Sequence, residues 1–193
     1  EKDPMKALHS ILHPKKVIAA DVGQISREGK RRRFIVSAGM GFDAGVCHEV
    51  CVSQWKKRLN KIGLGKLSYA VVALDRLRKD KPVKITITLP DGREKIFEKT
   101  LFAAFMNLPY EGGGFQFAPE ASVTDGCLDL VVAHHMSPVK AVWLLPRAFF
   151  GKHTKAKEIA VIRSPFVSVR AERSLPIHTD GEAAFSRKEA AAE

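Results

Sequence analysis

The stretch that decides the fold is Val83-Lys84-Ile85-Thr86-Ile87-Thr88-Leu89-Pro90-Asp91-Gly92. Apolar and polar residues alternate along its first seven positions, and a period of two is typical of a β-strand that buries one face. The Pro-Asp-Gly sequence that ends it favours a turn. Residues 95–106 follow and are predicted to form a long strand, because apolar and β-branched residues are frequent there. Strands therefore dominate from residue 82 onward.

Working outward from this stretch, the sequence predicts more strands, joined by only a few helices. The further elements are strands at 16–25, 33–38, 128–133 and 166–171, and helices at 44–55, 67–77 and 137–151, the last with a kink or break at Pro146. Strands and helices do not alternate strictly. We therefore predict a mainly β fold with helices (α+β): a two-layer antiparallel β-sandwich-like body with helices packed against it, and not a parallel doubly wound sheet.

The ends of the chain differ from this body. Residues 1–14 are predicted to contain a short helix, with Asp3 as N-cap and Pro4 at its first position. Residues 187–193 have little to bury and are predicted to be a frayed tail. The β-rich domain is assigned to residues 15–186. Because the sequence does not begin with Met, we expect it to be part of a longer chain.

Composition favours an anionic partner. The 193 residues carry 32 Lys and Arg against 21 Asp and Glu, which gives a net charge of +11. The basic clusters at 30–33, 56–61 and 76–81 are solvated by default, but they also suit an anionic membrane surface. Nucleic acid is disfavoured, because these clusters lack interleaved aromatic residues for stacking.

Cysteine usage and hydropathy bear on the compartment. Three cysteines are too few for a disulfide framework and indicate a reducing environment. No apolar run approaches the roughly 20 residues needed to cross a bilayer, and no secretory leader is recognisable. We therefore expect a cytoplasmic protein.

The first candidate site is the acidic turn Thr124-Asp125-Gly126-Cys127-Leu128-Asp129. Hard divalent cations prefer oxygen ligands, and an Asp beside a Gly offers a carboxylate together with nearby carbonyl groups. Mg²⁺ is the natural cation for such a turn. The alternative is an ordinary tight turn, for which Asp-Gly is also common.

The second candidate site is the acidic turn Pro176-Ile177-His178-Thr179-Asp180-Gly181-Glu182. On an extended backbone, residues two apart face the same side, so Asp180 and Glu182 are expected to address one cleft. One carboxylate could then accept a proton while the other holds a metal or orients a base. A solvated turn is the alternative.

Three successive glycines, Gly112, Gly113 and Gly114, follow the long predicted strand and Asn107. Glycines allow close backbone approach, so their amides could line a ligand site, although a flexible loop explains them equally well. The stretch Gly39-Met40-Gly41-Phe42-Asp43-Ala44 matches a dinucleotide-binding fingerprint only formally, because no acidic residue follows about 20 positions later. Tight packing explains its glycines as well.

Taken in order, these motifs resemble the C-terminal domain of the diacylglycerol kinase and sphingosine kinase family, especially the bacterial soluble lipid kinases. The resemblance covers residues 17–185, and its order along the chain makes it specific. The matching positions are 38–44, 65–69, 107 with 112–115, 118–119, 125–129, 151–153 and 180–182.

The resemblance implies the β-rich half of a two-domain kinase. In this family an N-terminal α/β domain binds ATP through a Gly-Gly-Asp-Gly-Thr loop, which this sequence lacks, so residues 1–14 are expected to be the linker from a missing nucleotide-binding domain. The substrate is then expected to be a diacylglycerol-like lipid hydroxyl, and peripheral attachment to an anionic membrane is expected. By itself the fragment is expected to be inactive.

The resemblance also assigns roles. It places the general base at Asp180, with Glu182 as a supporting carboxylate. It places Mg²⁺ at the Asp125 side chain with the carbonyl groups of Ser122 and Cys127.

Asn107, Gly112, Gly113 and Gly114 are assigned to the ATP side of the site. A non-catalytic lipid-binding or membrane-binding module and a nicotinamide-nucleotide kinase-like domain remain alternatives, and a homodimer is left open.

Overall fold

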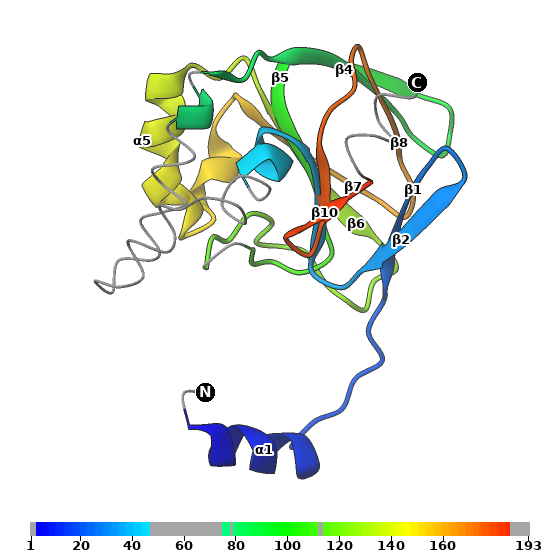
Figure 1. Ribbon diagram of the computed structural model, residues 1–193, viewed down its shortest axis with the longest axis vertical. Helices are drawn as coiled ribbons and strands as arrows, with labels where there is room; N and C mark the ends of the chain where they lie inside the picture. The colour runs from blue at the N-terminus through cyan, green and yellow to red at the C-terminus, as the bar shows by residue number, and fades with distance from the viewer. Residues whose placement is uncertain (1–2, 47–74, 78, 112–113, 186–193) are drawn as a thin grey trace.

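The computed structural model describes residues 3–46, 75–77, 79–111 and 114–185 (Figure 1). The strands are β1 Gly23–Arg27, β2 Lys30–Phe34, β3 Ser37–Gly41, β4 Val83–Thr88, β5 Glu94–Met106, β6 Leu128–His134, β7 Ile159–Ser164, β8 Ser168–Ala171, β9 Ile177–Thr179 and β10 Glu182–Ala184. Eight of them form one sheet in the order β10-β9-β3-β5-β4-β8, with β6 paired to β5 and β7 paired to β6. β1 and β2 form a separate hairpin.

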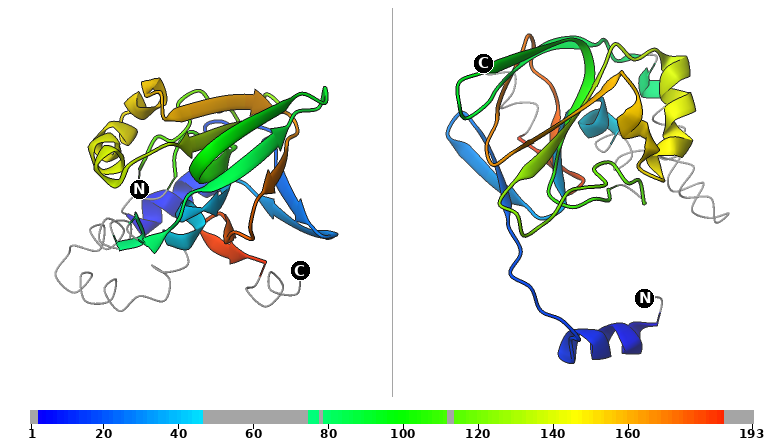
Figure 2. Two further views of the ribbon diagram at one scale, coloured as in Figure 1. Left: turned by 90° about the horizontal axis from the view of Figure 1, so that it is seen from above. Right: turned by 180° about the vertical axis from the view of Figure 1, so that it is seen from behind.

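The long strand β5 organises this sheet. Its first half pairs with β4, and its second half lies between β3 and β6. The strand is irregular where the halves meet: Lys99 has a left-handed φ of 48°, and the register with β6 shifts between Thr100 and Phe102. Such irregularities bend a strand and increase its twist, so the sheet curves around its own inner face (Figure 1 and Figure 2).

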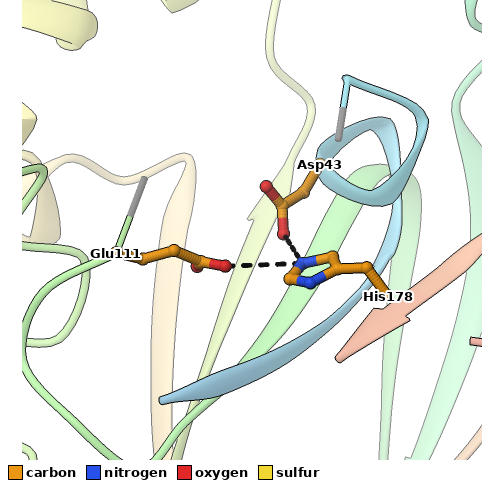
Figure 3. Close-up of side chains that lie close together, drawn as sticks. All are labelled: Asp43, Glu111 and His178. Atoms are coloured by element: carbon orange, nitrogen blue, oxygen red, sulfur yellow. Dashed lines mark hydrogen bonds and ion pairs between the residues drawn. The ribbon is translucent and has the colours of Figure 1, made fainter. Parts of the chain in front are cut away.

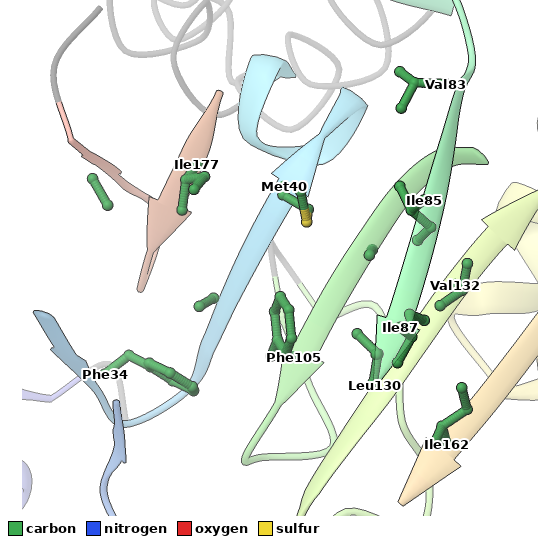
Figure 4. Close-up of a cluster of buried hydrophobic side chains, with 13 residues drawn as sticks. Phe34, Met40, Val83, Ile85, Ile87, Phe105, Leu130, Val132, Ile162 and Ile177 are labelled. Atoms are coloured by element: carbon green, nitrogen blue, oxygen red, sulfur yellow. The ribbon is translucent and has the colours of Figure 1, made fainter. Parts of the chain in front are cut away.

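The inner face holds the main hydrophobic core. Side chains from β2, β3, β4, β5, β6, β7, β9 and β10 meet there, and Figure 4 labels ten of these residues. Ile85, Ile87, Leu130 and Val132 are at most 1% exposed. All strand pairings among the described residues are antiparallel, and strands from opposite parts of the curved sheet share one core. The predicted antiparallel β-sandwich-like body is therefore confirmed.

The outer face of the sheet carries a second core under helix α5 (Pro138–Ala148). Side chains alternate between the two faces along β5, so Phe102, Ala104 and Met106 point outward when Ala103 and Phe105 point inward. The outward residues pack with Leu144 of α5. This second core places α5 over the outer face of the sheet.

Helix α1 (Pro4–Leu12) stands apart from the β-rich body at the end of an extended segment (Figure 1 and Figure 2). The Asp3 carboxylate caps it by accepting hydrogen bonds from the amides of Met5 and Lys6, as the sequence predicted. None of its residues is buried. Among the described residues, no helix combines the length and apolar character needed to cross a membrane.

Some of the other predictions from the sequence are confirmed, and some are wrong. Strands β4, β5, β6 and β8 lie close to their predicted positions, whereas β7 was not predicted. The strands predicted at 16–25 and 33–38 are only partly right, because β1 begins at Gly23 and the second stretch is divided between β2 and β3. Ser137 caps α5, but the helix continues through Pro146 to Ala148 instead of breaking there. The predicted helices at 44–55 and 67–77 lie largely outside the described residues, although 42–46 and 75–77 are helical. Gly112, Gly113 and the tail at 187–193 also lie outside them.

Candidate functional site

Asp180 lies at the tip of the β9–β10 hairpin. Asp180 and Gly181 form its two-residue loop, and both have positive φ values, 48° and 81°. Two successive positive φ values are typical of a type I′ turn, which Asp-Gly favours because both residues tolerate this conformation. The second predicted acidic turn therefore exists, but as a hairpin.

The Asp180 carboxylate is held by three consecutive backbone amides. Its Oδ2 accepts a hydrogen bond from the N–H of Ile35 at 3.0 Å, and its Oδ1 accepts from Val36 at 2.8 Å and from Ser37 at 3.1 Å. A carboxylate has about four acceptor sites, so these three amides orient the group and leave about one acceptor site free. Asp180 thus ties the hairpin to the segment that leads into β3.

The geometric reason for pairing Asp180 with Glu182 is wrong. The expectation assumed an extended backbone, but the chain reverses between the two residues and Glu182 pairs with Thr179. Glu182 is exposed at the start of β10. Its supporting role stays a prediction, as does the role of Asp180 as general base.

A buried cluster of Asp43, Glu111 and His178 lies beside this hairpin (Figure 3). Asp43 follows β3, Glu111 follows β5, and His178 is on β9 with no exposed surface. His178 Nε2 lies 2.7 Å from Asp43 Oδ2 and 3.5 Å from Glu111 Oε1. Ser37, which also contacts Asp180, donates its hydroxyl to Glu111 Oε1 at 2.6 Å. The cluster and the Asp180 turn therefore form one network.

Gly39 makes room for this cluster. A Cβ at that position would collide with Asp43 Oδ2 and His178 Nε2. The glycine in the formal dinucleotide fingerprint is thus explained by close packing of a strand against the cluster.

Burial and charge shift two pKa values in the cluster. Burial and the neighbouring Asp43 charge raise the pKa of Glu111 from 4.5 to about 7, against the opposing influence of His178 and Ser37. Burial alone would lower the pKa of His178, but the hydrogen bond to Asp43 and the charges of Asp43, Glu111 and Asp180 raise it overall. Both groups therefore hold protons more tightly than they do in water.

Asp43, Glu111 and His178 are residue types that can bind a metal ion, but the hydrogen bonds of the cluster indicate that a proton occupies the position a metal would need. The N–H of Gly181 donates to His178 Nδ1 at 3.3 Å, which places the imidazole proton on Nε2, where it is donated to Asp43. A metal would need the lone pair of that same nitrogen. We interpret the cluster as a hydrogen-bonded support of the Asp180 hairpin.

Asn107 supports the same segment from the other side. Its side-chain amide donates to the carbonyl groups of Asp21 at 3.0 Å and Ile35 at 2.8 Å, and its backbone N–H donates to Val36 at 3.0 Å. Asn107 is 1% exposed. Both side-chain amide hydrogens therefore already have carbonyl partners. The predicted contact of Asn107 with ATP stays a prediction.

The glycine loop begins beside the cluster. Glu111 and Phe115 close it with two backbone hydrogen bonds, of 2.9 and 3.0 Å, and Gly114 inside it is exposed with a φ of 104°. Because Glu111 contacts Ser37, the loop starts next to the Asp180 turn. Its role in binding ATP stays a prediction.

The turn at Asp125 has a second carboxylate that the sequence did not reveal. Asp125 Oδ1 accepts a hydrogen bond from Cys127 N–H at 3.0 Å, and Asp21 Oδ2 accepts one from Gly126 N–H at 2.8 Å. Ser122 and Cys127 lie in the same partly exposed turn. Two carboxylates and nearby carbonyl oxygens are the donor set that Mg²⁺ takes, so the residues fit the implied cation. Only tertiary structure brings Asp21 here.

An apolar pocket lies between α5 and the outer face of the sheet. Its lining residues are Phe42, Leu77, Leu101, Phe102, Phe117, Met136, Ala141, Val142, Leu144, Leu145, Ala148, His153 and Ile159. His153 is 3% exposed, and its ring nitrogens make no hydrogen bond of good geometry among the described residues, although the backbone of Phe117 interacts with the ring. Burial lowers the pKa of His153, so the ring is neutral at pH 7. Phe42 connects the pocket to the cluster, because the next residue is Asp43.

Fold and site together define a β-sandwich-like domain with an acidic hairpin at one edge and an apolar pocket under a helix. Residues 35–188 match the family described as the YegS C-terminal NAD kinase beta sandwich-like domain. The chain belongs to this family, as the motif resemblance predicted.

Named relatives agree with this assignment. The chain is 29% identical over 149 residues to the provisionally named lipid kinase YtlR of Bacillus subtilis (strain 168), covering 77% of this chain and 48% of that protein. It is also 29% identical over 163 residues to a diacylglycerol kinase of Mycobacterium tuberculosis, covering 84% and 50%. The chain spans about half the length of these relatives.

A solved structure shows the same fold. A provisionally named diacylglycerol kinase from Bacillus anthracis str. Sterne superposes with a TM-score of 0.60 at 19% identity, covering 89% of this chain and 52% of that one.

Glu111→Gln tests the protonated cluster. A carboxyl whose pKa is raised on folding stabilises the fold below its unfolded pKa, and this contribution is lost as pH rises through about 7. The raised pKa of His178 also lowers stability as pH rises, but His178 is present in both proteins, so this effect largely cancels in the comparison. The variant should therefore gain stability relative to the parent as pH rises from about 5 to about 8, on the order of 1–2 kcal/mol or a few degrees.

Thermal unfolding at several pH values measures this difference. Glu120→Gln, the same change at an exposed side chain, is the matched control. A difference between Glu111→Gln and the parent that does not change with pH would contradict the assignment.

Proposed function

We propose that this chain is the C-terminal, substrate-side domain of an ATP-dependent lipid kinase that phosphorylates the hydroxyl of a diacylglycerol-like lipid. The observation that carries the proposal is the junction at Phe42 and Asp43. Phe42 lines the apolar pocket, and Asp43 contacts His178, two residues before Asp180. A lipid alcohol has the matching division into an apolar chain and a polar hydroxyl.

The pocket suits the apolar part of such a substrate. All but one of its lining side chains are apolar, and α5 and the sheet provide opposite walls. Burying an acyl chain there is favourable by about 0.8 kcal/mol per CH₂ group. His153 offers a hydrogen-bonding group whose nitrogens have no hydrogen bond of good geometry among the described residues, which suits a polar part of the lipid.

In the proposed reaction, Asp180 accepts the proton of the lipid hydroxyl as that oxygen attacks the γ-phosphorus of ATP. The three amides that hold Asp180 keep its carboxylate oriented, which matters because phosphoryl transfer depends mainly on positioning. The oxygen–phosphorus bond to the substrate forms while the bond to ADP breaks. Glu182 is proposed to support this site from the other end of the hairpin turn.

Mg²⁺ and ATP are the proposed cofactors. Asp125 and Asp21, with the carbonyl groups of Ser122 and Cys127, would hold Mg²⁺, which would stabilise the loops that meet there. We propose that ATP is bound mainly by a nucleotide-binding domain outside this chain, with Asn107, Gly112, Gly113 and Gly114 on the facing rim. The net charge of +11 supports a cytoplasmic protein attached peripherally to anionic membranes.

Asp180→Asn in the full-length protein tests the base. Removing a general base should lower kcat for lipid phosphorylation by at least about 100-fold. Asn also presents an N–H group to an amide donor, so a stability loss of about 1 kcal/mol is expected, and activity is measured below the melting temperature. Asp91→Asn, in the β4–β5 turn, is the control. Near-parental turnover of Asp180→Asn would exclude Asp180 as the base.

Ala148→Phe tests the pocket. Ala148 is 6% exposed and lines the pocket, so a phenyl ring there should compete with the acyl chain. KM for long-chain substrate should rise about tenfold, equivalent to losing about two buried CH₂ groups, while a short-chain substrate is affected less. Ala19→Phe, on the exposed segment after α1, is the matched control. Equal effects on both chain lengths would argue against acyl binding in this pocket.

Asp125→Ala tests the cation site without reference to activity. Mg²⁺ should raise the melting temperature of the parent by a few degrees and leave the variant unchanged, because a ligand that binds only the folded state stabilises it. Asp91→Ala controls for loss of an exposed turn carboxylate. The same Mg²⁺-dependent shift in Asp125→Ala and parent would rule this site out.

A further inference from the structure

Helix α5 has an apolar stripe on the side that faces away from the sheet. Val139, Trp143, Pro146 and Phe150 are spaced by four, three and four residues, so they follow one face of α5 and of the turn after it. Val139 is 81% exposed, Trp143 51% and Phe150 72%. We call these four residues the α5 stripe. The opposite side of α5 packs on the sheet through Leu144 and Ala148.

The segment that carries the α5 stripe is rich in cations. Residues 138–157 contain five Lys or Arg residues and no Asp or Glu. The guanidinium of Arg147 lies 3.3 Å from the centre of the Trp143 ring, and Lys140 Nζ lies 5.3 Å from it. Lys140 also pairs with Glu158 at 3.3 Å. An apolar strip with Trp and Phe, flanked by Lys and Arg, is the composition of helices that lie in the membrane interface.

We propose that the α5 stripe is the surface by which this domain docks on an anionic lipid bilayer, with Trp143 and Phe150 inserted between headgroups. Charge complementarity selects this occupant, because Lys is depleted from the cores of protein interfaces but favours anionic headgroups. The proposal rests on the proposed function only in explaining why a membrane is approached.

The position of the α5 stripe relates membrane docking to the apolar pocket. Ala141, Val142, Leu144, Leu145 and Ala148 of the same helix line the apolar pocket. A bilayer on the outer side of α5 would therefore hold acyl chains one helix width from that pocket.

The end of α5 also contacts the glycine loop. Phe149 stacks on Phe115 with ring centres 4.1 Å apart, and Gln116 N–H donates to the carbonyl group of Ala148 at 2.8 Å. The docked helix is thus connected to the loop that begins beside Glu111.

Vesicle sedimentation tests the proposal on the chain itself. The probes are vesicles of phosphatidylcholine alone and of phosphatidylcholine mixed with phosphatidylglycerol. The parent should bind the anionic vesicles at least about tenfold more tightly, and salt should weaken that binding. Trp143→Ser combined with Phe150→Ser should reduce it at least about tenfold, since two large apolar side chains no longer insert.

The matched control is Ile96→Ser combined with Phe166→Ser, which removes two apolar side chains, 56% and 64% exposed, outside α5. The control should bind as the parent does. Because α5 variants could lose stability, Lys152→Gln combined with Lys155→Gln provides a second test that leaves the stripe intact and should also weaken binding to anionic vesicles. Melting temperatures are compared for all variants.

Several results would overturn the proposal. The first is vesicle binding by the stripe variant that equals that of the parent. The second is a loss of vesicle binding in the Ile96 and Phe166 control as large as that in the stripe variant. The third is a concentration-dependent dimer of the parent that the stripe variant no longer forms, while its vesicle binding persists. The last result would assign the stripe to a second copy of the chain.

Failure of the proposed function has a different signature. Stripe-dependent vesicle binding without phosphorylation of a soluble short-chain lipid by the full-length protein would reject the kinase and keep the docking surface. Phosphorylation of that soluble lipid with stripe-independent vesicle binding would do the reverse.

Discussion

The site depends on the hydrogen bonds that three consecutive backbone amides donate to the Asp180 carboxylate. The donors at 35–37 belong to the segment entering β3, while Asp180 belongs to a hairpin more than 140 residues later. The short strand pairings and the contacts of His178 with Asp43 and Glu111 hold the β9–β10 hairpin on the sheet, and the three amides fix the carboxylate at its tip. Asn107 holds the donor segment in place from β5, so the position of one carboxylate is determined from three parts of the chain.

The irregular strand β5 explains why the acidic hairpin and the apolar pocket lie near each other. Its inward residues complete the main core, and its outward residues form the floor under α5. β3 runs beside its second half, so the residues just after β3 reach both features. Phe42 turns toward the pocket and Asp43 toward His178. A single sheet thus serves as the scaffold for an apolar region and a charged one.

Patterns local in sequence predicted the fold well and the site in part. Alternation along β4 identified the antiparallel body, and Asp-Gly located the turns at Asp125 and Asp180, because both signals depend on neighbouring residues. The predicted direction of the Glu182 side chain was wrong, because the sequence alone did not distinguish a two-residue hairpin loop from an extended backbone.

The cluster and Asp21 were missed for a different reason. Asp43, Glu111 and His178 come from three distant segments, and Asp21 reaches a turn 105 residues later. No rule of residue spacing predicts contacts between such distant segments. The sequence contained one indication, the glycine at position 39, which leaves room for the cluster.

Charge gives the cluster a further consequence for the proposed chemistry. Asp43, Glu111 and Asp180 concentrate negative charge in a chain that is otherwise strongly basic. A nucleotide phosphate approaching this edge would be repelled by three ionised carboxylates, because Coulomb energies grow as water is excluded. The proton held by Glu111 near pH 7 reduces that charge while Asp180 stays bound to its amides. In the proposed reaction, protonation of Glu111 would therefore leave Asp180 as the carboxylate for the substrate hydroxyl and lower the local charge that a phosphate meets.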